Sequence, residues 1–145
     1  MDALLSDGAF TPRAITRNPA SDKALALKAR GAEVAQANVW DKESIKKAIT
    51  GCEGVFGVRQ NHLLLNSSIL TCVQVTDFFD PTIYPNNLKG EIEQGKNLVD
   101  AAKEVGIKFF VWSSLPGCAK ISKGKYTHIA HFDSALYLLL LVLWV

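Results

Sequence analysis

The chain has 145 residues, of which 48% are hydrophobic and 21% are charged, and its formal net charge is +2. This length provides one domain with a core, and the composition excludes intrinsic disorder. The small net charge and the absence of a run of Lys and Arg argue against direct binding of nucleic acid.

The three cysteines, Cys52, Cys72 and Cys118, are odd in number and have no Cys-x-x-Cys spacing. We therefore expect reduced thiols, with neither a disulfide framework nor a metal site. No secretory signal is recognisable, so we expect a cytoplasmic protein, with the nucleus as an alternative. The eleven apolar residues 135–145 fall short of the ~20 that span a membrane, and no membrane association is expected.

The first predicted elements are a strand, a helix and a second strand. Residues 13–17 (RAITR) form a short β-branched run, and Ser21 can cap a helix that ends before Gly31. Residues 33–39 (EVAQANV) then read as a strand. Asp41 has the position of an N-cap for the next helix, which Gly51 ends.

Three further elements follow in the same alternation. Residues 54–58 (GVFGV) predict a strand. A helix is predicted from the apolar and small residues that share one of its faces: Leu88, Ile92, Gly95, Val99 and Ala102. Residues 108–114 (KFFVWSS) predict a strand buried on both faces. Strands separated by helices indicate an α/β fold with a parallel sheet.

Several blocks of sequence resemble the NmrA-like family of atypical short-chain dehydrogenases: AITRNPASDKALALKARGAEV, QANVWDKESIKKAITGCEGVFGV and EQGKNLVDAAKEVGIKFFVWSSL. The resemblance covers residues 4–134 and implies a domain over 1–134, with the apolar tail 135–145 outside the family pattern. It implies a Rossmann-like three-layer fold, a parallel sheet with helices on both faces. Members bind NADP(H) or NAD(H); some are redox-sensing regulators and others transfer hydride.

The resemblance assigns cofactor-binding roles to residues at the ends of strands. Thr16, Arg17 and Asn18 would meet the adenosine ribose, and an arginine there favours the 2′-phosphate of NADP. Asn38 stands where relatives commonly have an aspartate beside the adenine. The remaining expected contacts line the cofactor from later strands: Val58, Thr76 and Ser113.

The catalytic candidates depart from the family pattern. Short-chain dehydrogenases pair a tyrosine, or in this family often a histidine, with a lysine four residues later. Tyr126 and His131 are followed at that spacing by Ala130 and Ala135. Without the lysine a tyrosine keeps a pKa near ~10, which suits neutral-pH catalysis poorly. Ser114, at the end of its strand, is the third candidate.

The start of the chain also departs from the family. Relatives open with a strand and a G-x-x-G-x-x-G turn that holds the pyrophosphate, whereas Met1–Leu5 matches the end of the helix after that turn. The fold is therefore expected to be incomplete. The absent strand belongs in the middle of the sheet, so we expect its neighbours to have unpaired edges.

Residues 58–74 interrupt the resemblance and show no clear periodicity. Removing them joins residues 56–57 to residues 75–79 in one continuous family-like strand end. The ends of the segment can be encoded by splice-donor and splice-acceptor sequences. We expect a retained intron that is dispensable for folding, with a genuine surface insertion as the alternative.

Three functions follow from these observations. The first is an NADP(H)-binding redox sensor or regulator with a regulatory protein partner, here as a fragment with impaired cofactor binding. The second is an NAD(P)H-dependent reductase of a small carbonyl or quinone. The third is a protein-interaction module that needs no cofactor.

Overall fold

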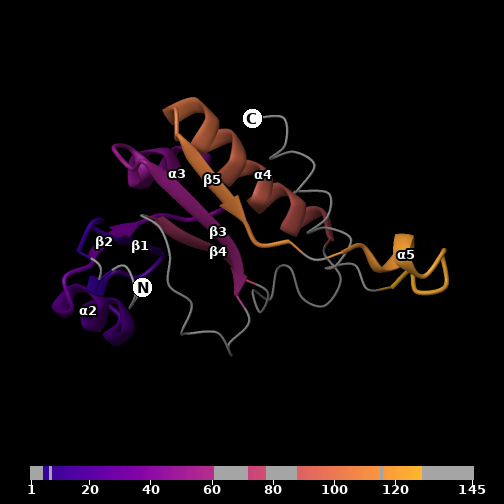
Figure 1. The fold of residues 1–145 in the computed structure, drawn as a ribbon, viewed down its shortest axis with the longest axis horizontal. Helices are drawn as coiled ribbons and strands as arrows, with labels where there is room; N and C mark the ends of the chain where they lie inside the picture. The colour runs from indigo at the N-terminus through magenta and orange to yellow at the C-terminus, as the bar shows by residue number, and fades with distance from the viewer. Residues whose placement is uncertain (1–4, 7, 61–71, 78–87, 115, 129–145) are drawn as a thin grey trace.

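The computed structural model describes residues 5–6, 8–60, 72–77, 88–114 and 116–128. Strands and helices alternate along the first part of the chain, and a long helix precedes the last strand (Figure 1). In chain order they are β1 (Arg13–Thr16), α2 (Asp22–Ala29), β2 (Glu33–Gln36), α3 (Lys42–Ile49), β3 (Gly54–Gln60), β4 (Cys72–Asp77), α4 (Leu88–Val105), β5 (Phe109–Trp112) and α5 (Cys118–Ile121).

The strands form one five-stranded sheet in the order β2-β1-β4-β3-β5, and every pairing is parallel. Because parallel strands end at the same edge, the carboxyl ends of β1 and β2 lie side by side, with Thr16 opposite Gln36. At the other side of the sheet Gly57 of β3 is opposite Trp112 of β5. The α/β class and the parallel sheet predicted from the sequence are confirmed.

The position of β4 corrects three expectations. Residues 72–74 form the first half of a strand, although the sequence suggested no element there. This strand lies between β1 and β3, where unpaired edges were expected: Val73 is opposite both Ala14 and Phe56. Val58 and Val75 are also neighbours on adjacent strands, not successive parts of one strand. The β-branched residues of 72–77 suit a strand, and the open position in the sheet gives it partners on both sides.

Helices cover both faces of the sheet (Figure 1). α3 and α4 pack on one face, where Ile15 of β1 joins Ile45 and Leu98 in a buried cluster. Ala14 precedes Ile15 and therefore points to the opposite face, where α2 contacts β1 and β2 and buries Ala24. The connection β1-α2-β2 leads to one side of β1, and the connection β2-α3-β3 leads to the other. Because both crossovers are right-handed, α2 and α3 lie on opposite faces, which gives a three-layer arrangement.

α3 and α4 are also joined by ion pairs. Glu104 of α4 accepts from Lys42 Nζ at 2.7 Å and lies 2.9 Å from Lys46 Nζ. Hydrogen bonds from both lysines lower the pKa of Glu104 from 4.5 to about 2, and the same contacts raise the pKa of each lysine. The two helices are thus joined by ion pairs at their surface in addition to the apolar cluster beneath them.

The strand β5 differs from its prediction because only one of its faces is buried. Phe110 and Trp112 pack against the buried cluster beneath α4, and their rings stack with centroids 6.3 Å apart. Phe109 and Val111 point to the opposite face and are 57% and 39% exposed. The apolar run in the sequence suggested burial on both faces, but β5 is an edge strand and no described element covers its outer face.

Among the described helices, none has the length and apolar character needed to cross a membrane. The described residues also contain no group of three or more His, Cys, Asp or Glu side chains placed to hold a metal ion. The apolar tail 135–145 and the candidate His131 lie outside the described residues.

Candidate functional site

The turn after β1 builds one side of the candidate site. Thr16 Oγ1 accepts from the backbone N–H of Asn18 at 3.2 Å, and Asn18 Oδ1 accepts from the N–H of Ala20 at 3.0 Å. The next residues lead into α2, whose N-cap Ser21 accepts from the N–H of Ala24. Thr16 and Asn18 therefore shape the turn through their own side chains, while Arg17 between them is exposed.

The turn after β2 builds the other side. Asn38 Oδ1 accepts from the N–H of Trp40 at 3.1 Å, and the N-cap Asp41 accepts from the N–H groups of Glu43 and Ser44. The Ser44 side chain contacts the end of the strand: its Oγ accepts from the N–H of Asn38 at 2.9 Å. The start of α3 is thereby fixed against the carboxyl end of β2.

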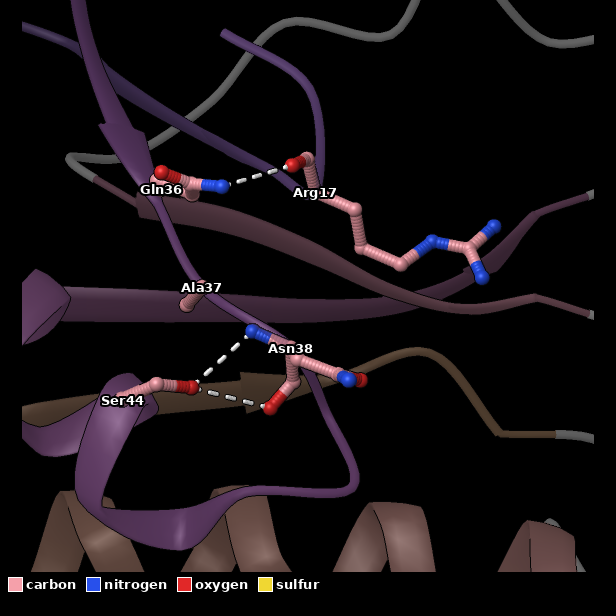
Figure 2. A pocket seen from close by; sticks show the side chains of 5 residues that line it. All are labelled: Arg17, Gln36, Ala37, Asn38 and Ser44. Carbon is pink, nitrogen blue, oxygen red and sulfur yellow. Dashed lines mark hydrogen bonds between the residues drawn. The ribbon is translucent and has the colours of Figure 1, made fainter.

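A hollow of about 370 Å³ lies between these two turns and is lined by Arg17, Gln36, Ala37, Asn38 and Ser44. Figure 2 shows the Arg17 and Asn38 side chains extending toward the same side. The amide of Gln36 donates from Nε2 to the carbonyl of Arg17 at 3.1 Å and so ties the two turns together. Among the described residues, the lining contains one cation, Arg17, and no carboxylate, which suits an anionic ligand.

The structure brings two of the predicted cofactor residues, Arg17 and Asn38, into one hollow. Gln36 and Ser44 were missed by sequence reasoning, although each carried a signal. Gln36 lies two residues before Asn38, the spacing that places side chains on one side of a strand. Ser44 is three residues after the N-cap Asp41, in the first turn of the helix that meets the strand end.

Of the other predicted cofactor residues, Thr16 and Asn18 shape the turn after β1, and the remaining three lie on or directly after later strands. Val58 is on β3 opposite Val75, and Thr76 is on β4 opposite Arg59. Ser113 follows β5 and is exposed, and its N–H donates to the carbonyl of Gly57 at 2.9 Å. All three belong to the carboxyl half of the sheet, the edge where open α/β sheets bind ligands.

The described catalytic candidates are also apart from the hollow. Ser114 is half-buried after β5. Tyr126 follows α5 in a segment that extends away from β1 and β2 (Figure 1), and it is 54% exposed with Lys125 Nζ 5.4 Å from its ring centroid. Its backbone N–H donates to Ser122 Oγ at 2.9 Å. Neither residue lines the hollow that contains Arg17.

A parallel sheet covered on both faces, with a polar hollow at the carboxyl ends of its strands, defines an α/β fold of the Rossmann type. The model of the NmrA-like family matches residues 1–136, so the chain belongs to that family.

Relatives in this family are considerably longer than the chain. It is 32% identical over 124 residues to an NmrA-like family domain-containing protein of Dictyostelium discoideum, covering 85% of this chain and 33% of the relative. An NmrA-like family domain-containing oxidoreductase, notA, of an Aspergillus species is 33% identical over 124 residues, covering 85% and 32%. The chain thus spans about a third of the length of these relatives.

Solved structures share the fold. The triphenylmethane reductase of Citrobacter sp. in complex with NADP(H) aligns with a TM-score of 0.61 at 20% identity, covering 91% of this chain and 36% of that one. The NADPH-dependent quinone oxidoreductase of Escherichia coli in complex with NADPH aligns with a TM-score of 0.58 at 22% identity, covering 97% and 40%.

Proposed function

We propose that this chain carries the part of an NADP(H) site that holds the 2′-phosphoadenosine end of the cofactor, and that it acts as a redox sensor or regulator. The observation that carries the proposal is the hollow itself. Arg17 lines it directly after β1, and no carboxylate is among the described residues that line it. A guanidinium at this position pairs with a 2′-phosphate, whereas a carboxylate would accept from the free 2′-hydroxyl of NAD.

The rest of the dinucleotide is matched less well by the described residues. A pyrophosphate is normally held by a glycine turn that joins a strand to a helix N-terminus. Gly51, Gly54 and Gly57 have the G-x-x-G-x-x-G spacing, but Gly51 follows the end of α3 and Gly57 lies within β3. This spacing therefore begins before β3 and continues into it, at the amino end of the strand and not at the carboxyl end where open α/β sheets bind ligands. The described residues fit the phosphoadenosine end and offer no such turn for the pyrophosphate.

A bound NADP(H) would supply or accept hydride, and this chain's residues would contribute binding and orientation. Arg17 would hold the 2′-phosphate, and Gln36 would fix the Arg17 turn through the 3.1 Å bond to its carbonyl. No lysine follows Tyr126 or His131 at the family spacing. This departure favours a sensor, with a regulatory protein partner that recognises the bound state, over a catalyst.

A reductase of a small carbonyl or quinone is the second candidate, and it is favoured by the curated relatives that are named oxidoreductases. The two functions differ in what they do to NADPH. Steady loss of NADPH absorbance with a panel of quinones, above the rate without protein, would establish the reductase. Partner binding that changes with NADPH and NADP, without turnover, would establish the sensor.

The binding part of the proposal has its own test. Adenosine 2′-phosphate and adenosine are titrated into the isotope-labelled chain and followed by amide NMR shifts. The phosphate ester is expected to bind in the millimolar range and to shift residues around Arg17, while adenosine binds more weakly. In Arg17→Ala the two ligands should become equivalent. If adenosine 2′-phosphate and adenosine bind equally well to the unmodified chain, the assignment of Arg17 to the 2′-phosphate is wrong.

A further inference from the structure

The strand β5 lies at an edge of the described sheet, and its free side carries backbone groups that can form hydrogen bonds. In the strand order, β3 is its single described neighbour (Figure 1). The N–H groups of Phe109 and Ser113 donate to carbonyls on the β3 side at 3.3 and 2.9 Å. Successive residues of a strand direct their backbone groups to opposite sides, so the N–H and C=O of Phe110 and Trp112 face away from β3. Such an edge can pair with a further strand.

The side chains of β5 do not protect this edge against pairing. Phe109 and Val111 are 57% and 39% exposed on the outer face. Residues 109–112 contain neither proline nor a charged residue, and the adjacent Lys108 forms an ion pair with Glu53 at 3.0 Å. Edge strands are commonly protected by proline or by unpaired charge. The other edge strand, β2, by contrast has charged or amide side chains at both of its ends.

The free edge of β5 is complementary to itself in an antiparallel arrangement. When a second copy is turned about a two-fold axis beside Val111, Phe110 of one copy lies opposite Trp112 of the other. These two residues then exchange both of their backbone hydrogen bonds, and the reversed pair does the same. Val111 is opposite Val111 of the second copy on the outer face, where a pair of β-branched side chains favours the sheet.

Charge does not oppose this arrangement. Lys108 precedes Val111 by three residues, so the lysines of the two copies lie at opposite ends of the paired strands. The formal net charge of each copy is +2, which leaves little repulsion between them. The symmetric pattern of backbone donors and acceptors therefore fits a second copy of this chain.

We propose that β5 is a self-association surface, which joins two copies of this chain into one continuous sheet. The proposal goes beyond the proposed function and does not depend on it, because it involves neither Arg17 nor the hollow. A strand of four residues provides a small interface. The association is therefore weak and reversible.

The mass of the full chain in solution tests the proposal. Sedimentation equilibrium is measured from about 10 μM to about 1 mM, a range that includes weak association. The average mass should rise with concentration from 15.8 kDa toward twice that value. A mass that stays at 15.8 kDa throughout would overturn the proposal.

Substitutions beside the axis test which surface is used. Val111→Lys and Val111→Glu each place like charges opposite one another and should weaken self-association by roughly three- to tenfold. An equimolar mixture of the two variants should associate more strongly than either variant alone, because opposite charges then meet. Leu25→Lys is the matched control, since Leu25 is an apolar residue of α2 that is 51% exposed. If Leu25→Lys has the same effect as Val111→Lys, or if the mixture does not recover, the surface is not β5.

Hydrogen exchange in the unmodified chain gives a second measurement, which holds even where a variant does not fold. The amides of Phe110 and Trp112 should exchange more slowly as the concentration is raised, because they face the second copy. The amide of Phe109, which already donates on the β3 side, should change less. If the mass rises while exchange at Phe110 and Trp112 stays constant, the copies associate through another surface and the proposal is wrong.

Discussion

The indole ring of Trp112 lies directly against the backbone of Gly57 on the neighbouring strand. A Cβ at Gly57 would come within 2.6 Å of Trp112 Cε3 and 3.3 Å of Leu98 Cδ2. Trp112 packs against the buried cluster, so its ring has little room to retreat. We expect Gly57→Ala to lower the free energy of unfolding by about 1–3 kcal/mol, the usual cost of overpacking a core, measured by urea denaturation.

A second substitution tests whether the contact with Trp112 is the cause. Trp112→Leu alone should destabilise the chain because a large, partly buried ring that packs against the buried cluster is lost. In that background, however, Gly57→Ala should cost much less than it does beside the tryptophan. If the two effects simply add, the alanine is harmful for a reason other than the ring.

The ion pairs of Glu104 predict a dependence of stability on acid. The folded pKa of Glu104 is about 2, below its ordinary value of 4.5. A lowered carboxyl pKa contributes stability that is present above the unfolded pKa and is lost as the pH falls toward the folded pKa. We therefore expect Glu104→Gln to be less stable than the unmodified chain at pH 7. The difference should shrink between pH 4.5 and about 2, as followed by denaturation at a series of pH values.

Salt and a neighbouring residue provide the controls for Glu104. Glu104 is exposed and the two lysines are partly exposed, so 1 M NaCl should reduce the difference between Glu104→Gln and the unmodified chain at pH 7. Glu93→Gln, at an exposed position of the same helix, should show a smaller effect at low salt. If the two substitutions lower the free energy of unfolding equally and independently of salt, the ion pairs between α3 and α4 do not stabilise the fold.

The strand β4 changes what is expected from removing residues 58–74. The sequence suggested that this segment is dispensable, yet the deletion removes Cys72 and Val73, the two residues that pair with β1. Without them the β2-β1 pair loses its described connection to the rest of the sheet. We now expect the deletion variant to lose its cooperative thermal transition in circular dichroism. If the deletion variant melts at the same temperature as the unmodified chain or at a higher one, β4 is not essential for folding and the intron hypothesis is supported.

Local signals in the sequence predicted where α2 and α3 begin and end. Ser21 and Asp41 are the N-caps of these helices, as expected. Gly31 and Gly51 follow them with positive φ. These features depend only on residues within one helical turn of each other, so they can be predicted from the local sequence. The position of β4 depends instead on which edges in the sheet are open, and this is decided by residues far away in the chain.

The same distinction holds for the candidate site. Arg17 and Asn38 were predicted because the resemblance to the NmrA-like family assigns cofactor contacts to these two positions. The roles of Gln36 and Ser44 depend on contacts between elements, such as the bond from Gln36 Nε2 to the carbonyl of Arg17. The exposure of Phe109 is a similar case: its apolar neighbours suggested a buried strand, and only the sheet order reveals that β5 is at an edge.

The last prediction concerns the strength of NADPH binding by the chain alone. A single exposed charge pair contributes ~0–1 kcal/mol, whereas micromolar affinity requires about 8 kcal/mol. Arg17 is exposed, and the described residues contain no glycine turn that would add backbone donors and a helix dipole for the pyrophosphate. Titration calorimetry should therefore show no saturable NADPH binding below the millimolar range.

A repaired protein should recover the affinity if this reasoning holds. A family-like strand and G-x-x-G-x-x-G turn fused ahead of Leu4 would supply backbone donors for the pyrophosphate. The fusion is made in two versions, with residues 58–74 and without them. Two versions are needed because the added strand competes with β4 for the same place in the sheet. In the version that binds NADPH, Arg17→Ala should weaken NADPH much more than NADH, since only NADPH carries the 2′-phosphate. Equal losses for the two cofactors would remove Arg17 from its assigned role. Micromolar NADPH binding by the unrepaired chain would show that other residues hold the pyrophosphate.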